Sequence, residues 1–120
     1  MPAHKNELTD RLARYREIKI TVTGRKSGRA ISIPVWFVLH DNKVLLLPVQ
    51  GSDTQWYKNV LQNSAIGIEA QGVEGKFHAV PTTKGPQVDD VIKKFREKYS
   101  VADVKKYYSK LDVAVLVELR

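Results

Sequence analysis

Apolar and polar residues alternate along much of the first third of the chain. The alternating apolar positions are Ile18, Ile20 and Val22 before a short basic segment, and Ile31, Ile33 and Val35 after it. Alternation with a period of two on both sides of a glycine-containing turn is typical of a β-hairpin. We therefore expect one strand over residues 18–23, a second over residues 30–40, and a tight basic turn between them.

The rest of the chain continues with short strands and amphipathic helices. Further strands are predicted over residues 43–49, 65–71, 76–82 and 112–119, and helices over residues 7–17, 54–62, 85–99 and 101–108. Asp53 is a suitable N-cap for the helix that begins at Thr54. The last strand is apolar on both faces, which predicts a central place in the sheet. Pro34 and Pro48 cannot donate to a ladder, so each is expected at an edge or a bend.

These elements predict a mainly β protein with peripheral helices. About six strands follow one another by short turns, which does not match an alternating βαβ sheet. We expect a single domain over residues 1–120, built as a small antiparallel barrel, with an N-terminal helix within residues 1–17.

Composition narrows the class of protein. Hydrophobic residues make up 42% and charged residues 28% of the 120 residues, as in a globular domain. No apolar run approaches the ~20 residues of a membrane helix, and the first residues lack the apolar core of a secretory signal, so we expect a cytoplasmic protein. The absence of cysteine excludes disulfides and thiolate chemistry, and the 3 histidines lack the spacing of a metal site.

The basic turn is the first candidate site. It carries Arg25, Lys26 and Ser27 between two glycines, where backbone N–H groups and cations can meet a phosphate or carboxylate. The formal net charge of +7 also favours an anionic partner. The order of residues is not that of a P-loop, and neither Gly-x-Gly-x-x-Gly nor Gly-x-Ser-x-Gly occurs. We predict no protein nucleophile and no catalytic acid or base.

Aromatic residues form the second candidate site. Trp56 and Tyr57 lie on the predicted helix over residues 54–62, where core packing is the usual role and a wall for a flat ring is the alternative. The preceding loop offers polar side chains and backbone N–H groups at Gln50, Gly51 and Ser52. A second basic segment, residues 93–110, contains tyrosines, but interleaved acids favour a solvated helix face over nucleic-acid binding.

Three motifs in fixed order are typical of one family. They are Thr21–Arg29 (TVTGRKSGR), Ile33–Val38 (IPVWFV) and Gln55–Leu61 (QWYKNVL). In this combination the chain resembles the deazaflavin-dependent nitroreductases, also described as deazaflavin-dependent quinone reductases, from Ile18 to the last strand. The resemblance implies a split β-barrel of the kind that binds flavin mononucleotide (FMN).

The resemblance also implies a cofactor and its site. The usual coenzyme of the family is the deazaflavin F420, whose anionic tail meets the basic turn and whose ring lies beside the strand after it. Hydride transfer from this coenzyme reduces a quinone, a nitro compound or another small acceptor. The residues mapped from the resemblance are Arg25, Lys26, Ser27, Pro34, Val35, Trp36 and Trp56. The residue patterns above add Gln50, Gly51, Ser52 and Tyr57 as expected cofactor-binding residues. Candidates on the substrate side are Lys105, Tyr107 and Tyr108.

Two departures from the family pattern keep other cofactors open. Ile31 and Gln50 stand where family members usually carry cations. A plain flavin such as FMN, with a single phosphate, needs fewer cations, and haem is a third, less favoured alternative. The alternative to an enzyme is a non-enzymatic split-barrel module that carries a flavin or a tetrapyrrole or binds nucleic acid. Because small barrels with exposed apolar strands often pair, a homodimer is also considered.

Overall fold

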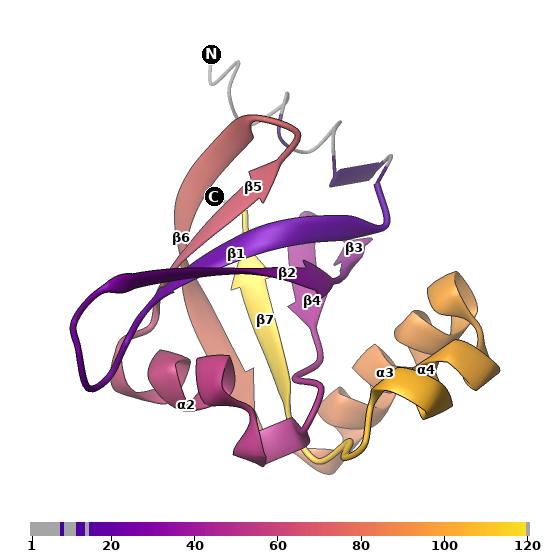
Figure 1. Cartoon of the computed structure of the whole chain (residues 1–120). Coiled ribbons are helices and arrows are strands. Elements are labelled where there is room, and N and C mark those ends of the chain that lie inside the picture. The colour runs from indigo at the N-terminus through magenta and orange to yellow at the C-terminus, as the bar shows by residue number, and fades with distance from the viewer. Residues whose placement is uncertain (1–7, 9–11, 14, 120) are drawn as a thin grey trace.

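The computed structural model describes residues 8, 12, 13 and 15–119 of the chain. Within them, seven strands form one antiparallel sheet that curls on itself (Figure 1). The strands are β1 (Glu17–Thr23), β2 (Ala30–Trp36), β3 (Val38–His40), β4 (Lys43–Leu46), β5 (Ala65–Ala70), β6 (Val73–Thr82) and β7 (Ala114–Glu118). The helical elements are the 3₁₀ turn η1 (Gly51–Asp53), α2 (Gln55–Gln62), α3 (Gly85–Tyr99) and α4 (Val101–Tyr107). The predicted split barrel with peripheral helices is confirmed.

The sheet closes through one bent segment of chain. The strand order is β2-β1-β5-β6-β7-β4-β3, so β2 and β3 lie at its two ends although only Phe37 separates them in the sequence. β2 pairs with β1, and β3 pairs with β4. The prediction of a single strand over residues 30–40 was wrong at this point, because Phe37 is the bend at which the chain changes partner.

Two turns have the backbone that tight hairpins require. Asp41 and Asn42 join β3 to β4 with φ of 49° and 62°, and Gln71 and Gly72 join β5 to β6 with φ of 51° and 86°. Positive φ at both central residues matches the right-handed twist of the flanking strands. The turn before β6 is therefore shorter than predicted, and β6 begins at Val73 rather than at residue 76.

The central strand was predicted correctly. β7 lies between β6 and β4, and its residues from Ala114 to Val117 are buried or half-buried. By contrast, β4 ends at Leu46, so Pro48 lies beyond the strand in which it was expected. Pro34 does lie on an edge strand, as predicted.

The helices pack on two different parts of the curled sheet. α2 packs Trp56, Tyr57 and Val60 into the main core, while α3 and α4 enclose a second apolar cluster against β3 and β4. The predicted capping role of Asp53 was wrong, since Thr54 is the N-cap of α2 and Asp53 belongs to η1. α3 begins at Gly85 with a proline in its first turn, as predicted. No helix in residues 15–119 is both long and apolar enough to cross a membrane.

The predicted N-terminal helix lies largely outside the described residues. Leu8, Leu12 and Ala13 are helical. Leu8 and Leu12 are buried in the main core, as their spacing predicted. Glu17, expected to end this helix, is instead the first residue of β1.

Candidate functional site

A pocket of about 250 Å³ opens between the end of β2 and the end of α4. Its lining residues are Glu17, Pro34, Val35, Trp36, Leu47, Val49, Tyr107 and Tyr108. Three predicted cofactor-binding residues and two predicted substrate-side residues thus share one cavity. Trp36, the last residue of β2, lies on one side of the cavity. Tyr107 and Tyr108, at the end of α4, lie on the other.

Aromatic rings surround the inner side of this pocket. The indole of Trp36 stacks on the ring of Tyr99, with centroids 4.3 Å apart and planes 6° apart. Tyr107 meets the indole edge-on at 5.4 Å, and Tyr108 lies 6.1 Å from it. Offset and edge-to-face contacts of this kind stabilise a fixed aromatic wall. Trp36 is half-buried and Tyr107 is exposed, so part of this wall is open to a ligand.

The phenols of Tyr99 and Tyr108 stay protonated at neutral pH. Burial raises the pKa of the Tyr108 hydroxyl, and the neighbouring Tyr99 adds to the effect. Burial likewise raises the pKa of Tyr99 to about 12. A neutral phenol can donate a hydrogen bond, whereas a phenolate can only accept one. The pocket therefore has neutral, aromatic inner walls.

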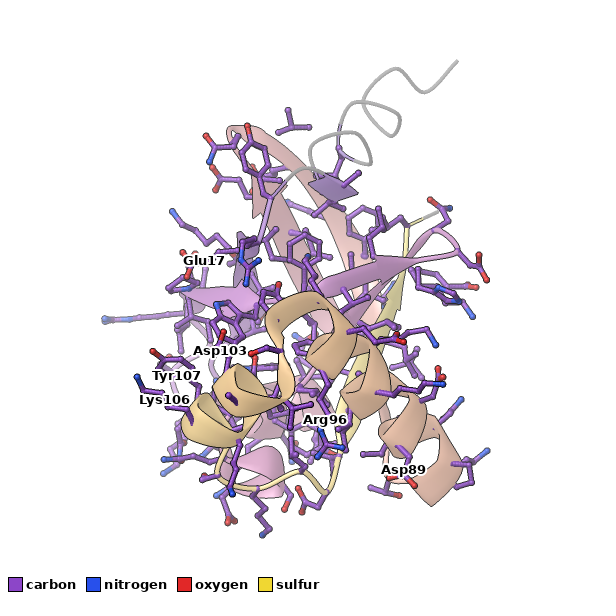
Figure 2. The ribbon with its side chains drawn as sticks, turned by 90° about the vertical axis from the view of Figure 1, so that its right-hand side faces the viewer. Glu17, Asp89, Arg96, Asp103, Lys106 and Tyr107 are labelled. Carbon is purple, nitrogen blue, oxygen red and sulfur yellow. The ribbon has the colours of Figure 1, made fainter. Side chains whose placement is uncertain are left out.

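Charged residues lie in and near the pocket. Figure 2 shows Glu17 of β1 on the same side of the molecule as Lys106 and Tyr107 of α4. The Lys106 ammonium lies 5.2 Å from the ring centre of Tyr107. Lys105 is exposed on the same helix and lies outside the pocket lining. Of these three charged residues, only Glu17 belongs to the pocket lining.

The basic turn forms a separate, smaller pocket with α2. The volume of this pocket is about 220 Å³. Its lining includes Arg25, Lys26 and Ser27 together with Gln55 and Asn59. Arg25 donates from its backbone N–H to Oδ1 of Asn59 at 3.0 Å and from Nη1 to the same oxygen at 2.8 Å. Nη2 of Arg25 donates to Oε1 of Gln55 at 2.8 Å. Arg25 thus ties the turn to α2, while Lys26 and Ser27 remain exposed.

The loop before α2 uses its backbone donors within the protein. The N–H of Gln50 donates to Oγ1 of Thr54 at 2.8 Å, and the N–H of Gly51 donates to the carbonyl oxygen of Pro48 at 3.0 Å. The N–H of Ser52 donates to a carboxylate oxygen of Asp112 at 2.9 Å. These three groups hold the loop in place, so the expected cradle of free N–H groups is not formed in this conformation.

The two expected aromatic residues of α2 lie in the core. Trp56 is 5% exposed and Tyr57 is 3% exposed, and both belong to the main apolar cluster. Burial, with the charge of Asp112, raises the pKa of Tyr57. Core packing was the usual role given to these residues from the sequence, and their position fits that role.

The basic turn and Trp36, both expected to contact one coenzyme, lie in separate pockets. The turn and Trp36 lie at opposite ends of β2, a strand of seven residues that spans about 20 Å at ~3.3 Å per residue. In Figure 1 the tip of the β1–β2 hairpin lies beside α2 on the left, whereas α3 and α4 lie on the right. A ring held at Trp36 reaches the turn only through a long tail.

Five contributors were missed from the sequence. Glu17, Leu47 and Val49 line the aromatic pocket, and Gln55 and Asn59 hold the basic turn. Gln55 and Asn59 are part of the QWYKNVL motif, so the motif signalled constrained positions but not their partner. Nothing in the local pattern around the other three residues indicates a pocket, because the fold brings their segments together.

The curled sheet and its pocket define a split-barrel protein. The fold is similar to that of an F420-H2 dependent reductase (FDR-A), with 24% identity, coverage of 86% of this chain and 94% of that chain, and a TM-score of 0.67. A chain described as a domain-swapped dimer is similar at 22% identity, with coverage of 94% and 96% and a TM-score of 0.68. HutZ, a heme storage protein from Vibrio cholerae, is similar at 13% identity, with coverage of 94% and 87% and a TM-score of 0.66. These likenesses confirm the fold.

The sequence assigns the chain to one family. It belongs to the family described as an uncharacterized protein conserved in bacteria (DUF2255), whose model matches residues 8–115. No curated protein matches the chain.

Proposed function

We propose that this protein is an oxidoreductase that holds a deazaflavin or flavin ring in the aromatic pocket and reduces a small organic acceptor such as a quinone or a nitro compound. The observation that carries the proposal is the meeting of Trp36 with Tyr107 and Tyr108 in one cavity. The motifs of the β1–β2 hairpin and of α2 support it, as does the similarity in fold to a reductase.

The residues present fit a flat, neutral ring. The cavity of about 250 Å³ is just below the usual range of about 300–1,000 Å³ for ligand pockets, so it suits a ring system with its tail outside. The described lining contains neither histidine nor methionine, the usual neutral ligands of haem iron, and the pKa of Tyr108 is raised, which disfavours a phenolate ligand. A flavin-type ring therefore suits this pocket better than haem.

The protein contributes binding and orientation. When bound, the coenzyme supplies the hydride. Trp36 and Tyr107 present aromatic surface that fixes the plane of a ring, and the apolar side chains of Leu47 and Val49 exclude water beside it. Lys26, exposed at the basic turn, is the proposed partner for an anionic tail that follows β2, while Arg25 positions this turn.

Binding measurements test the proposal. We expect the purified protein to bind oxidised deazaflavin coenzyme or FMN at micromolar concentrations in calorimetric titrations, and the reduced deazaflavin to be oxidised when a small quinone is added. Tyr107→Ala should weaken binding at least tenfold by removing one aromatic wall. Val101→Ala, at an exposed apolar position on the same helix, is the matched control and should leave binding unchanged. Binding without turnover would favour a carrier, and haem as the preferred ligand would contradict the proposal.

A further inference from the structure

Among the described residues, no strand pairs with the outer edge of β2. β2 is the terminal strand of the described sheet and pairs with β1 on one side only. In an antiparallel pair, successive residues alternate between facing the partner strand and facing away from it. The parity along β2 therefore decides which backbone groups point outward.

Contacts at both ends of the hairpin fix this parity. At the turn, the N–H of Gly24 donates to the carbonyl oxygen of Arg29 at 2.8 Å, so position 29 faces β1. At the other end, the N–H of Phe37 donates to the hydroxyl of Tyr99 at 3.0 Å, and this hydroxyl lies 2.6 Å from the carbonyl oxygen of Arg16. Position 37 therefore also faces β1. The main-chain N–H and C=O groups of odd-numbered residues in β2 therefore point toward β1, and those of even-numbered residues point away from it.

A side-chain contact in mid-strand agrees with this parity. Oγ1 of Thr21 and Oγ of Ser32 are 2.8 Å apart across the pair. Side chains approach most closely at rungs that are not hydrogen-bonded. Ser32 thus belongs to the set whose main-chain groups point outward.

This alternation leaves one hydrogen-bond acceptor and one donor of the β2 main chain pointing outward at residues that line the aromatic pocket. Pro34 and Trp36 face away from β1, and both line this cavity. Pro34 has no N–H, so its outward group is a carbonyl oxygen, and the next outward group along the strand is the N–H of Trp36. Neither group has a strand partner among the described residues, so a ligand in the cavity could form a hydrogen bond with each of them.

We propose that the Pro34 carbonyl and the Trp36 N–H bind the imide edge of a planar heterocycle, in which a ring N–H lies beside a ring carbonyl. The carbonyl of Pro34 accepts from the ring N–H, and the N–H of Trp36 donates to the ring carbonyl. The ligand thereby completes the free edge of β2 in the way that an added strand would. This inference rests on the proposed function and deepens it, because it names the edge of the ring that the protein reads.

The side chains around this edge suit such a ligand. The Trp36 indole is fixed by stacking on Tyr99 at 4.3 Å, so the backbone beside it is held in a defined position. The Leu47 and Val49 side chains of the lining offer no hydrogen-bond donor or acceptor, whereas Glu17, Tyr107 and Tyr108 carry polar groups. In this proposal the strand edge orients the imide side of the ring, and aromatic contact supplies affinity.

A pair of probes that differ at one ring position tests the inference. Lumiflavin carries the imide N–H, and 3-methyllumiflavin carries a methyl group in its place. We expect lumiflavin to bind at least tenfold more tightly in calorimetric titrations. In ¹⁵N–¹H spectra of the labelled full chain, lumiflavin should shift the backbone amide of Trp36, with the amides of Ser32, on the same free edge, and Val35, which faces β1, as controls.

The outcomes separate this inference from the proposed function. Equal affinity for the two probes would overturn recognition of the imide edge and leave a ring-binding pocket intact. Binding of neither probe would overturn both. Hydrogen exchange in the ligand-free protein gives a further check, since Ser32 and Trp36 should exchange faster than Ile33 and Val35. Slow exchange at Trp36 would contradict the free edge itself.

Discussion

The hydroxyl of Tyr99 takes the place of a strand partner for Phe37. It accepts from the N–H of Phe37 at 3.0 Å and donates toward the carbonyl oxygen of Arg16 at 2.6 Å. The Phe37 carbonyl in turn accepts from Nζ of Lys98 at 2.8 Å. The bend that closes the barrel therefore leaves neither main-chain group of Phe37 unpaired, although this residue belongs to no strand.

Removing this hydroxyl should destabilise the fold. Tyr99→Phe keeps the ring that stacks on Trp36 but leaves the buried N–H of Phe37 without an acceptor, which costs about 1–3 kcal/mol. The free energy of unfolding in urea measures the loss. Tyr107→Phe, which removes an exposed hydroxyl, is the control and should change stability by less than about 0.5 kcal/mol. Equal stability of the native protein and Tyr99→Phe would refute the bridging role.

Stability should depend on pH through Lys98 and Tyr99. Burial, with the charge of Arg16, lowers the pKa of Lys98 to about 8. The unfolded chain keeps this proton up to about pH 10.4, so it binds more protons than the folded state above pH 8 and stability rises with pH. The pKa of Tyr99 is raised to about 12, whereas an unfolded tyrosine ionises near pH 10, so stability falls above pH 10.

Urea unfolding between pH 7 and pH 11 tests this dependence. We expect a maximum of stability near pH 10 in the native protein. Lys98→Met keeps the apolar stem but removes the titrating amine, so the rise between pH 8 and pH 10 should flatten while the fall above pH 10 remains. An unchanged rise in this variant would show that another group titrates.

Two glycines with positive φ should respond very differently to alanine. Gly51 has φ +56°, and a Cβ there would overlap the carboxylate of Asp112 and lie 2.9 Å from the carbonyl oxygen of Lys110. Gly72 has φ +86° with open space around it. Gly72→Ala should cost about 1–2 kcal/mol for the left-handed backbone alone. Gly51→Ala should cost at least about 1 kcal/mol more because of overpacking. Similar thermal midpoints for the two variants would mean that the loop before α2 adjusts freely.

Substitutions at Arg25 and Lys26 of the basic turn should have different effects, because Arg25 stabilises the fold and Lys26 is proposed to bind the coenzyme tail. Arg25→Ala removes the contacts with Gln55 and Asn59 and should lower stability by about 1–3 kcal/mol, whereas Lys26→Ala should change it by less than about 0.5 kcal/mol. Calorimetry should show that Lys26→Ala weakens binding of the deazaflavin coenzyme but not of tail-less lumiflavin.

Two further variants check this division of roles. Asn59→Asp keeps an acceptor for Arg25 and should preserve more stability than Asn59→Ala, in which the N–H of Arg25 loses its partner. Lys106→Ala, beside the ring of Tyr107, tests the other route for a tail. A larger loss of coenzyme affinity in Lys106→Ala than in Lys26→Ala would move the proposed tail site to α4.

The sequence predicted those parts of the fold that depend on local pattern. Alternation identified the hairpin of β1 and β2, and apolar character on both faces identified β7 as central. The break at Phe37 could not be predicted, because it depends on a tyrosine 62 positions later in the chain. The pocket was predicted only in part for the same reason: Pro34 and Tyr107 were named separately, and tertiary packing brings them together.

Tertiary packing also explains the residues whose expected position was not observed. Trp56 lies on the inner face of an amphipathic helix, where either the core or a cofactor can occupy the space beside it. Backbone donors at Gly51 and Ser52 looked available because their partners, Pro48 and Asp112, are fixed only by the folded loop. Motif residues thus indicated constrained positions more reliably than they indicated what each position contacts.

The place of β7 in the sheet has a consequence during protein synthesis. β7 is the only link between β6 and β4 in the described sheet, yet residues 114–118 leave the ribosome after all the other strands. Until then, the nascent chain carries two unjoined strand edges that can pair with other chains. We therefore expect translation that stops before residue 114 to yield aggregated fragments rather than a smaller folded domain.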